Sequence, residues 1–395
     1  MSGNRATDVA IIGGGIVGTA LAADLAGRGA RVTLFERAGI AAGASGRNSG
    51  AVWYPADPVL GALYRETLAR YREVVNEMAD ELPGDAPELA FRLDERPAGI
   101  LTLSHDEAAL RAQAEAFAVA NPDFGAQFVD AGALATLEPG LADGLAAVRL
   151  DIGFPVAPAA AARAFAALAI ARGADVREGE DASIELYGDI AAGVRTATGV
   201  TAAGYVVVTA GPWSPGVIDP TGAWRPILPF WGVIVELELA SPPRHVLEEA
   251  DIDAAIEPDG GLANDAGGAT GFSFVTVAGR SSLGSTFLPF EPDPPAYEPR
   301  LREGGARYLP AIAGSTTRGL RACARPLALD GRPLVGAVPG IDGLFVAAGH
   351  GPWGISTGPA SARHVAALLL GEPDPRTPGV AAGTDAARFG APPSR

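Results

Sequence analysis

The sequence predicts an α/β fold in which a parallel sheet with flanking helices is joined to a mostly antiparallel second region. Three observations support this prediction. Residues 8–36 show a strand–helix–strand pattern, and helical and strand patterns alternate again between residues 158 and 210. Residues 242–310 instead have short segments with dense glycine and proline, which is typical of an antiparallel sheet and its loops. The parts of the parallel sheet are therefore separated along the chain.

The first unit, DVAIIGGGIVGTALAADLAGRGARVTLFE at 8–36, carries glycines at the spacing of a Rossmann-type nucleotide-binding turn. Gly13 permits the tight turn after the strand, Gly15 lets a pyrophosphate approach the backbone, and Gly18 lets the helix pack closely on the sheet. The N-terminus of that helix, which includes Ile16 and Val17, presents free N–H groups to the phosphates. The pattern predicts a bound dinucleotide.

Glu36 ends the second strand of this unit, where a carboxylate accepts hydrogen bonds from ribose hydroxyls. The same carboxylate repels a 2′-phosphate, which favours FAD or NAD over NADP. The competing interpretation is a structural strand–helix–strand unit without a ligand.

Further elements follow from periodicity and from glycine and proline positions. Helices are predicted at 66–82, 106–120, 158–172 and 359–370, and strands at 91–103, 175–177, 195–198, 200–203, 205–210, 231–239 and 343–348. Residues 349–354 form a glycine-rich turn before the last helix, and residues 373–395 are expected to be a disordered tail.

Composition excludes several classes of protein. The formal charge of −16 argues against nucleic acid as a partner, and no apolar run is long enough to span a membrane. The motif begins close to Met1 and leaves no room for a signal peptide, so a cytoplasmic location is expected. The single cysteine, Cys323, rules out an internal disulfide, and neither it nor the spacing of the four histidines suggests a metal site. All 30 basic residues are arginine, so no lysine chemistry is available.

Four further segments make the sequence resemble the FAD-dependent D-amino-acid oxidase superfamily, whose members include glycine oxidase, sarcosine oxidase and D-amino-acid dehydrogenase. They are GASGRNSG at 43–50, VVVTAGPWS at 206–214, PFWGVIVEL at 229–237 and CARPLALDGRPLVGAVPGIDGLFVAAGHGPWGISTGPASA at 323–362. The resemblance extends from residue 8 to about residue 371. It implies a discontinuous Rossmann-type FAD-binding domain at 1–85, 150–228 and 322–372, and a mostly antiparallel α+β substrate domain at 86–149 and 229–321.

The resemblance also implies which residues approach FAD. Ser45 can donate a hydrogen bond to a phosphate oxygen and Arg47 can add charge, although a local turn would also explain this loop. Gly211 lets the backbone approach the adenosine end, unless it only ends a strand. The turn at 349–355 opens a helix whose N–H groups would stabilise negative charge on the flavin. The full expected set is Gly13, Gly15, Ile16, Val17, Gly18, Glu36, Arg37, Ala44, Ser45, Arg47, Asn48, Ser49, Gly211, Trp213, Cys323, Gly349, Gly351, Gly354 and Ile355.

Two residues are candidates for substrate binding or catalysis. Arg325 matches the arginine that clamps the substrate carboxylate in glycine oxidase and D-amino-acid oxidase, and a guanidinium suits this bidentate task. The alternative is a structural ion pair with Asp330 or Asp342. His350, in the flavin-adjacent turn, either tunes the site or touches the substrate, with purely local hydrogen bonding as the alternative.

The resemblance implies oxidation of the C–N bond of an amino acid or related carboxylated amine by hydride transfer from Cα to flavin N5, giving an imine that hydrolyses. The electron acceptor is oxygen or another partner, and the missing lysine favours the latter. Cys323 falls where sarcosine-oxidase-like relatives attach flavin covalently, but Arg325-Pro326 follows the glycine-oxidase pattern, so non-covalent FAD is expected. Trp53, Tyr54 and Trp231 are expected in the core, with a pocket role as the alternative. A flavin-carrying subunit of a larger complex, a non-catalytic flavin-binding module and an NAD-dependent dehydrogenase remain alternatives.

Overall fold

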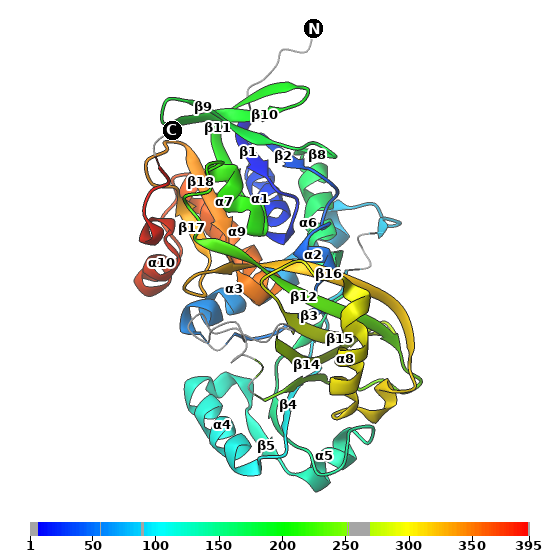
Figure 1. Ribbon diagram of the computed structural model, residues 1–395. Coiled ribbons are helices and arrows are strands. Elements are labelled where there is room, and N and C mark those ends of the chain that lie inside the picture. Colours follow the sequence, from blue (N-terminus) through cyan, green and yellow to red (C-terminus); the bar gives the residue numbers. More distant parts are fainter. Residues whose placement is uncertain (1–6, 56, 88–90, 251, 253–268, 394–395) are drawn as a thin grey trace.

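Two eight-stranded sheets organise the residues that the structure, a computed structural model, describes (Figure 1). These residues are 7–55, 57–87, 91–250, 252 and 269–393. One sheet is mainly parallel and occupies the upper half of Figure 1, and the other is mainly antiparallel and lies below it. The α/β prediction is confirmed.

The first sheet has the order β17-β18-β11-β1-β2-β8. β10 also pairs with β11, and β9 pairs with β10. The central pairs are parallel, from β8 through β2, β1 and β11 to β18, and β17 is antiparallel to β18. Alternate side chains of β1 enter cores on opposite faces, with Ile11 on one side and Ile12 on the other. Burial on both faces explains the continuous apolar run of this strand. The strands are β1 Thr7–Ile12, β2 Val32–Glu36, β8 Asp175–Glu178, β9 Ser183–Tyr187, β10 Ile190–Thr196, β11 Gly199–Val208, β17 Leu334–Ala337 and β18 Leu344–Ala348.

The second sheet has the order β16-β12-β15-β14-β13-β4-β6-β5, and only its β13–β4 pair is parallel among the described strands. The strands are β4 Ile100–Ser104, β5 Gln127–Val129, β6 Ala146–Leu150, β12 Ile227–Glu238, β13 Val246–Glu249, β14 Ala269–Val277, β15 Arg280–Phe287 and β16 Thr316–Ala328. β16 belongs to this sheet although the sequence assigned its last seven residues, from 322, to the first domain. The domain boundaries stay a prediction.

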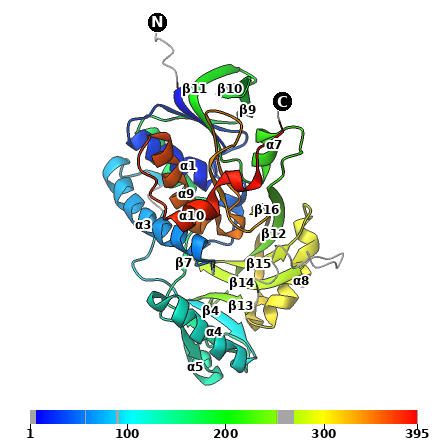
Figure 2. The same cartoon turned by 90° about the vertical axis from the view of Figure 1, so that its left-hand side faces the viewer.

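Among the described residues, a group of helices packs together beside the parallel sheet, and Figure 2 shows α1, α3 and α9 of this group. They include α1 Ile16–Gly27, α3 Pro58–Glu81, α6 Ala160–Ala171 and α9 Gly354–Leu369. The second sheet carries α4 Glu107–Ala120, α5 Ala131–Leu137 and α8 Pro294–Ala306. Along the described part of the chain, no helix combines the length and the apolar character needed to cross a bilayer.

Two helices begin earlier than their periodicity predicted. α3 begins at Pro58 rather than 66, because the Asp57 side chain caps the N–H groups of Val59 and Leu60. α9 begins at Gly354 rather than 359, and Pro359 lies inside it.

Pro359 cannot donate to the carbonyl four residues earlier, that of Ile355. The buried hydroxyl of Tyr71 donates to that carbonyl instead, at 2.7 Å. A contact from α3 therefore makes the proline tolerable within α9.

The expected disorder of residues 373–395 is wrong for most of this segment. α10 spans Pro378–Thr384 and is followed by a short 3₁₀ turn, and Val380 and Ala386 are buried. The indole of Trp224 also donates to the Gly390 carbonyl at 3.2 Å. The composition of the tail suggested disorder, but tertiary contacts with the first sheet order it.

Candidate functional site

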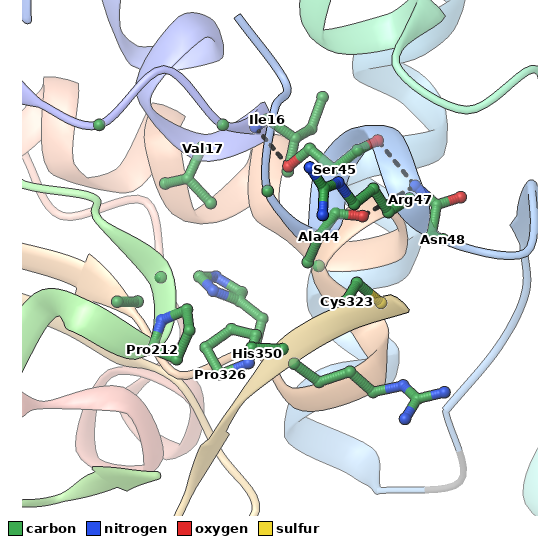
Figure 3. A pocket seen from close by; sticks show the side chains of 18 of the residues that line it. Ile16, Val17, Ala44, Ser45, Arg47, Asn48, Pro212, Cys323, Pro326 and His350 are labelled. Carbon is green, nitrogen blue, oxygen red and sulfur yellow. Dashed lines mark hydrogen bonds between the residues drawn. The ribbon is translucent and has the colours of Figure 1, made fainter. Parts of the chain in front are cut away.

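A cavity of about 580 Å³ is lined by both sheets and by the turns between them. The β1–α1 turn, the four-residue helix α2 (Ala44–Arg47), the end of β11 and the start of α9 form the side of the cavity where the sequence predicts the nucleotide. Residues of β12, β14, β15 and β16 line its other end. Figure 3 shows how residues from these separate segments converge.

The β1–α1 turn is packed too tightly for any side chain. Gly13 has φ +118°, and a Cβ there would lie 2.6 Å from the Thr209 carbonyl oxygen. A Cβ on Gly18 would lie 2.0 Å from the Gly13 oxygen and 2.5 Å from the Thr209 hydroxyl. That hydroxyl donates to the carbonyls of Ile12 and Gly13 and so fixes the turn, a role that the sequence did not indicate.

α1 begins at the cavity with Gly15 as its N-cap residue, which offers no side-chain cap. Its first N–H groups are therefore open to an anionic ligand, except that the Ile16 N–H donates to Ser45 Oγ at 2.9 Å. Asn48 donates to the carbonyls of Ala44 and Ser45 and holds α2 in place (Figure 3). The segment predicted as a phosphate loop is thus a short helix beside the helix N-terminus.

The acid expected at the ribose lies at the cavity wall. The Glu36 carboxylate accepts hydrogen bonds from the N–H groups of Gly14, at 2.7 Å, and Ala38, at 2.9 Å. Close by in sequence, the guanidinium of Arg37 lies 4.3 Å from the ring centre of Trp213, and both residues line the cavity. This pair gives that end of the cavity a flat, polarised surface.

The turn between β18 and α9 places Gly351, Gly354 and Ile355 in the lining. His350 is also there but is buried, and its Nε2 is hydrogen-bonded to Ser361 Oγ at 2.9 Å. Burial lowers the pKa of His350 to about 4, so the imidazole is neutral at physiological pH. The geometry supports a role in holding the turn against α9.

Arg325 lies at the opposite end, on β16. Its guanidinium donates to the Thr286 carbonyl at 3.0 Å and to the Ser285 hydroxyl. It lies over Gly232, where a Cβ would be 2.2 Å from Nη2, so only glycine leaves room for it. Burial lowers the pKa of Arg325 from its usual value, and no described carboxylate forms an ion pair with it. Of its two suggested ion-pair partners, Asp330 binds Arg388 instead, at 2.6 Å.

Cys323 also lies on β16, two residues before Arg325, and faces the cavity (Figure 3). Its burial raises the pKa of the thiol, although the cations of Arg325, Arg321 and Arg47 act in the opposite direction. The thiol form is therefore favoured over the reactive thiolate.

All the residues predicted for the site line the cavity except two glycines. Gly18 and Gly349 lie behind it, where Gly18 serves helix packing and Gly349 adopts φ +91° in the turn. Trp53 and Trp231 line the cavity, against the expectation of core packing, whereas Tyr54 stacks on Tyr64 and Phe124. Other lining residues missed from the sequence are Thr209, Glu248, Ser273, Ser285, Phe287 and Trp353.

The family model for FAD dependent oxidoreductases matches residues 8–368. The chain belongs to this family. The resemblance found in the sequence is confirmed, and the protein is an FAD-dependent oxidoreductase of the amino-acid oxidase or dehydrogenase type. The residues present fit FAD. The β1–α1 turn has glycines at positions where a Cβ would clash, so its backbone is uncovered, and the N-terminus of α1 beside it has no side-chain cap.

Relatives agree with this assignment over nearly the whole chain. A glycine oxidase of Pseudomonas aeruginosa is 28% identical over 384 residues, which cover 92% of this chain and 94% of the relative. The crystal structure of glycine oxidase from Geobacillus kaustophilus matches with a TM-score of 0.79 and 25% identity, over 97% of both chains. L-Proline dehydrogenase from P. horikoshii matches with a TM-score of 0.80 at 20% identity, over 97% of this chain and 98% of the other, and shares the fold.

Proposed function

We propose that this protein oxidises the C–N bond of an amino acid or of a related amine that carries a carboxylate. The observation that supports the proposal is Arg325, whose guanidinium faces a cavity shared with the FAD-binding turns. A fixed guanidinium pairs bidentately with a carboxylate and fixes the direction of the neighbouring Cα. The similarity to glycine oxidases supports the same class of substrate.

Bound FAD supplies the two-electron acceptor for a hydride that leaves the substrate Cα. The chain's own residues supply orientation and a dry cavity. Arg325 orients the substrate, while Trp53, Trp231 and Phe287 line the cavity with apolar surface that excludes water. Loss of the hydride turns the neutral amine into an iminium ion, which gives up a proton to become the imine that water hydrolyses after release.

The residues expected to hold FAD are the turn glycines Gly13 and Gly15, the carboxylate of Glu36, and Ser45 of α2, with the N-terminus of α9 at the flavin end. His350 is a poor general base because its pKa is held near 4 and its ring is bonded to Ser361. We therefore expect the substrate amine to lose its proton to solvent before oxidation, with no basic side chain required.

We also propose that FAD is bound non-covalently, because the buried Cys323 favours its unreactive thiol form. Acid precipitation of the purified protein should leave yellow flavin in the supernatant. Flavin retained in the washed pellet and lost in a Cys323→Ser variant would show a covalent link instead.

Anaerobic titration of the purified protein with D-, L- and N-methyl amino acids, followed by visible flavin absorbance, tests the proposed function. Bleaching by one of these groups is expected. A protein that dithionite reduces but that stays oxidised with every carboxylated amine would overturn the proposal. After reduction, mixing with oxygen or with an artificial electron acceptor then shows which of the two reoxidises the flavin.

A further inference from the structure

One face of the antiparallel sheet forms the floor of the substrate end of the cavity. Residues that pair directly across neighbouring strands point to the same face. Cys323 of β16 pairs with Gly232 of β12, and Ser273 of β14 pairs with both Gly284 of β15 and Glu248 of β13. Cys323, Ser273 and Glu248 all line the cavity, so this face continues from β16 to β13.

Opposite charges lie at two points on this floor. The Arg325 guanidinium reaches over Gly232 to β15, where it bonds to Ser285 and Thr286. Glu248 is half-buried on β13, and the hydroxyl of Thr102 on the neighbouring β4 donates to its Oε1 at 3.2 Å. The carboxylate is therefore oriented within the same cavity that holds the guanidinium.

The spacing of these groups suits a ligand with charges at both ends. Only β14 lies between β15 and β13. Neighbouring strands are about 4.8 Å apart, so the backbones of β15 and β13 are about 10 Å apart, and the Glu248 side chain shortens the gap. An extended lysine places its side-chain nitrogen about 7.5 Å from its carboxylate carbon, as six bonds of ordinary length and angle require. A basic amino acid can therefore reach both groups.

We propose that the substrate is a basic amino acid, bound with its α-carboxylate at Arg325 and its side-chain cation at Glu248. This inference rests on the proposed function and names its substrate class. A neutral side chain would offer the Glu248 carboxylate no charge-assisted hydrogen bond, and an acidic side chain would be repelled. The exposed Glu291 also lines the cavity, and the net charge of −16 favours the approach of cations.

Equilibrium binding tests the inference without turnover. 6-Aminohexanoate is lysine without its α-amine and hexanoate is its neutral counterpart, and neither can be oxidised at an α-amine. On the FAD-loaded enzyme, calorimetry should show 6-aminohexanoate binding about 10- to 100-fold tighter than hexanoate, as a charge-assisted hydrogen bond requires. The Glu248→Gln variant, checked for its FAD content, should reduce this ratio to within about threefold of one.

A matched control is Glu249→Gln, the next residue on the same strand, whose side chain points to the opposite face. Its Oε2 accepts from the Tyr308 hydroxyl at 2.9 Å. This variant should keep the wild-type binding ratio. Equal binding of the two ligands to wild-type enzyme, or loss of the ratio in Glu249→Gln to the same extent as in Glu248→Gln, overturns the inference.

Flavin reduction by lysine, arginine and norleucine separates the inference from the proposed function. Faster reduction by the two basic amino acids, with the preference lost in Glu248→Gln, supports the inference. If norleucine reduces the flavin as well as lysine does, the proposed function stands and the inference fails. If no amino acid reduces the flavin while 6-aminohexanoate still binds through Glu248, the proposed function fails and the substrate class fails with it, and only the binding of a two-charge ligand by the cavity stands.

Discussion

In the proposed function, the two ends of the cavity recognise their ligands in different ways. The nucleotide-binding side uses backbone: tightly packed glycines, a free helix N-terminus and turns held by side-chain hydrogen bonds. The substrate side uses side chains from adjacent strands, with Arg325 anchored on β15 and Glu248 across β14 from it. Backbone recognition depends on local spacing along the chain, whereas side-chain recognition depends on sheet register. The following variants test this difference.

The largest effect is expected from Gly18→Ala, because the added methyl group would overlap the Gly13 carbonyl and the Thr209 hydroxyl. Both are fixed by the turn, so neither can move away. We expect a loss of about 3 kcal/mol or more in the free energy of unfolding, together with loss of bound FAD. Thermal unfolding and the ratio of flavin to protein absorbance measure the two effects.

Gly304→Ala is the matched control, since no neighbouring atom lies within 4 Å of a Cβ at this helical position. It should keep both its FAD and its melting temperature. A Gly18→Ala protein that retained FAD and wild-type stability would show that the turn is looser than its packing indicates.

Arg325→Ala should impair substrate binding at the other end of the cavity without affecting FAD binding. FAD and fold should persist, because the guanidinium contacts the substrate sheet and no described carboxylate depends on it for an ion pair. Removing a buried charged partner costs several kcal/mol, so kcat/KM for carboxylated amines should fall about 100- to 1000-fold. Steady-state kinetics and flavin content measure this prediction.

Arg318→Ala, on the same strand but exposed and paired with Glu238, should leave the kinetics unchanged. The proposed role also predicts that wild-type enzyme prefers an amino acid with a free carboxylate over the corresponding amide, and that the Arg325→Ala variant has lost this preference. An unaltered preference would contradict carboxylate binding by Arg325.

The residues at one end of the cavity could be predicted from the sequence, whereas most of those at the other end could not. The glycine spacing of residues 13–18 and the acid at Glu36 identify the nucleotide side, because each requirement falls within one short segment. Ser285, Glu248 and Gly232 carry no comparable signal. Their meeting depends on the pairing of β12, β13, β14, β15 and β16, which are distant in sequence.

The same distinction explains the errors in the fold. The tail from 373 looked disordered because its composition is rich in Pro, Gly and Ala, but Thr377 caps α10 with Pro378 in its first turn. These local start signals were present in the sequence. The burial of Val380 could not be foreseen, since the surface that receives it is built by other segments.

His350 lies near the junction of the two ends, and its effect should appear as pH-dependent stability. Its pKa is about 4 in the folded protein and about 6.5 when unfolded, so below pH 6.5 the unfolded chain binds more protons. Stability is then full above pH 6.5 and is lost as the pH falls toward 4. Between pH 7.5 and 5, the wild-type protein should lose about 2 kcal/mol more than His350→Gln.

Chemical denaturation at the two pH values measures this difference. His245 serves as the comparison, because its ring bonds to the Glu138 carboxylate at 2.6 Å and no such carboxylate bonds to His350 in the described structure. His245→Gln should not remove the acid sensitivity that His350→Gln removes. Equal pH dependence in wild type and His350→Gln would show that the imidazole is solvated enough to protonate in the folded state.

The smallest effect is expected from Gly232→Ala, which tests whether a glycine at the substrate end serves a side chain rather than the cofactor. The new methyl group would occupy the position of the Arg325 guanidinium, but an arginine head can move where a backbone turn cannot. We therefore expect KM for carboxylated amines to rise about tenfold, equivalent to about 1.4 kcal/mol, with FAD content unchanged. Gly319→Ala is the control, because its nearest neighbour would be 3.9 Å away. Loss of FAD in Gly232→Ala would place this glycine with the cofactor and remove the division between the two ends.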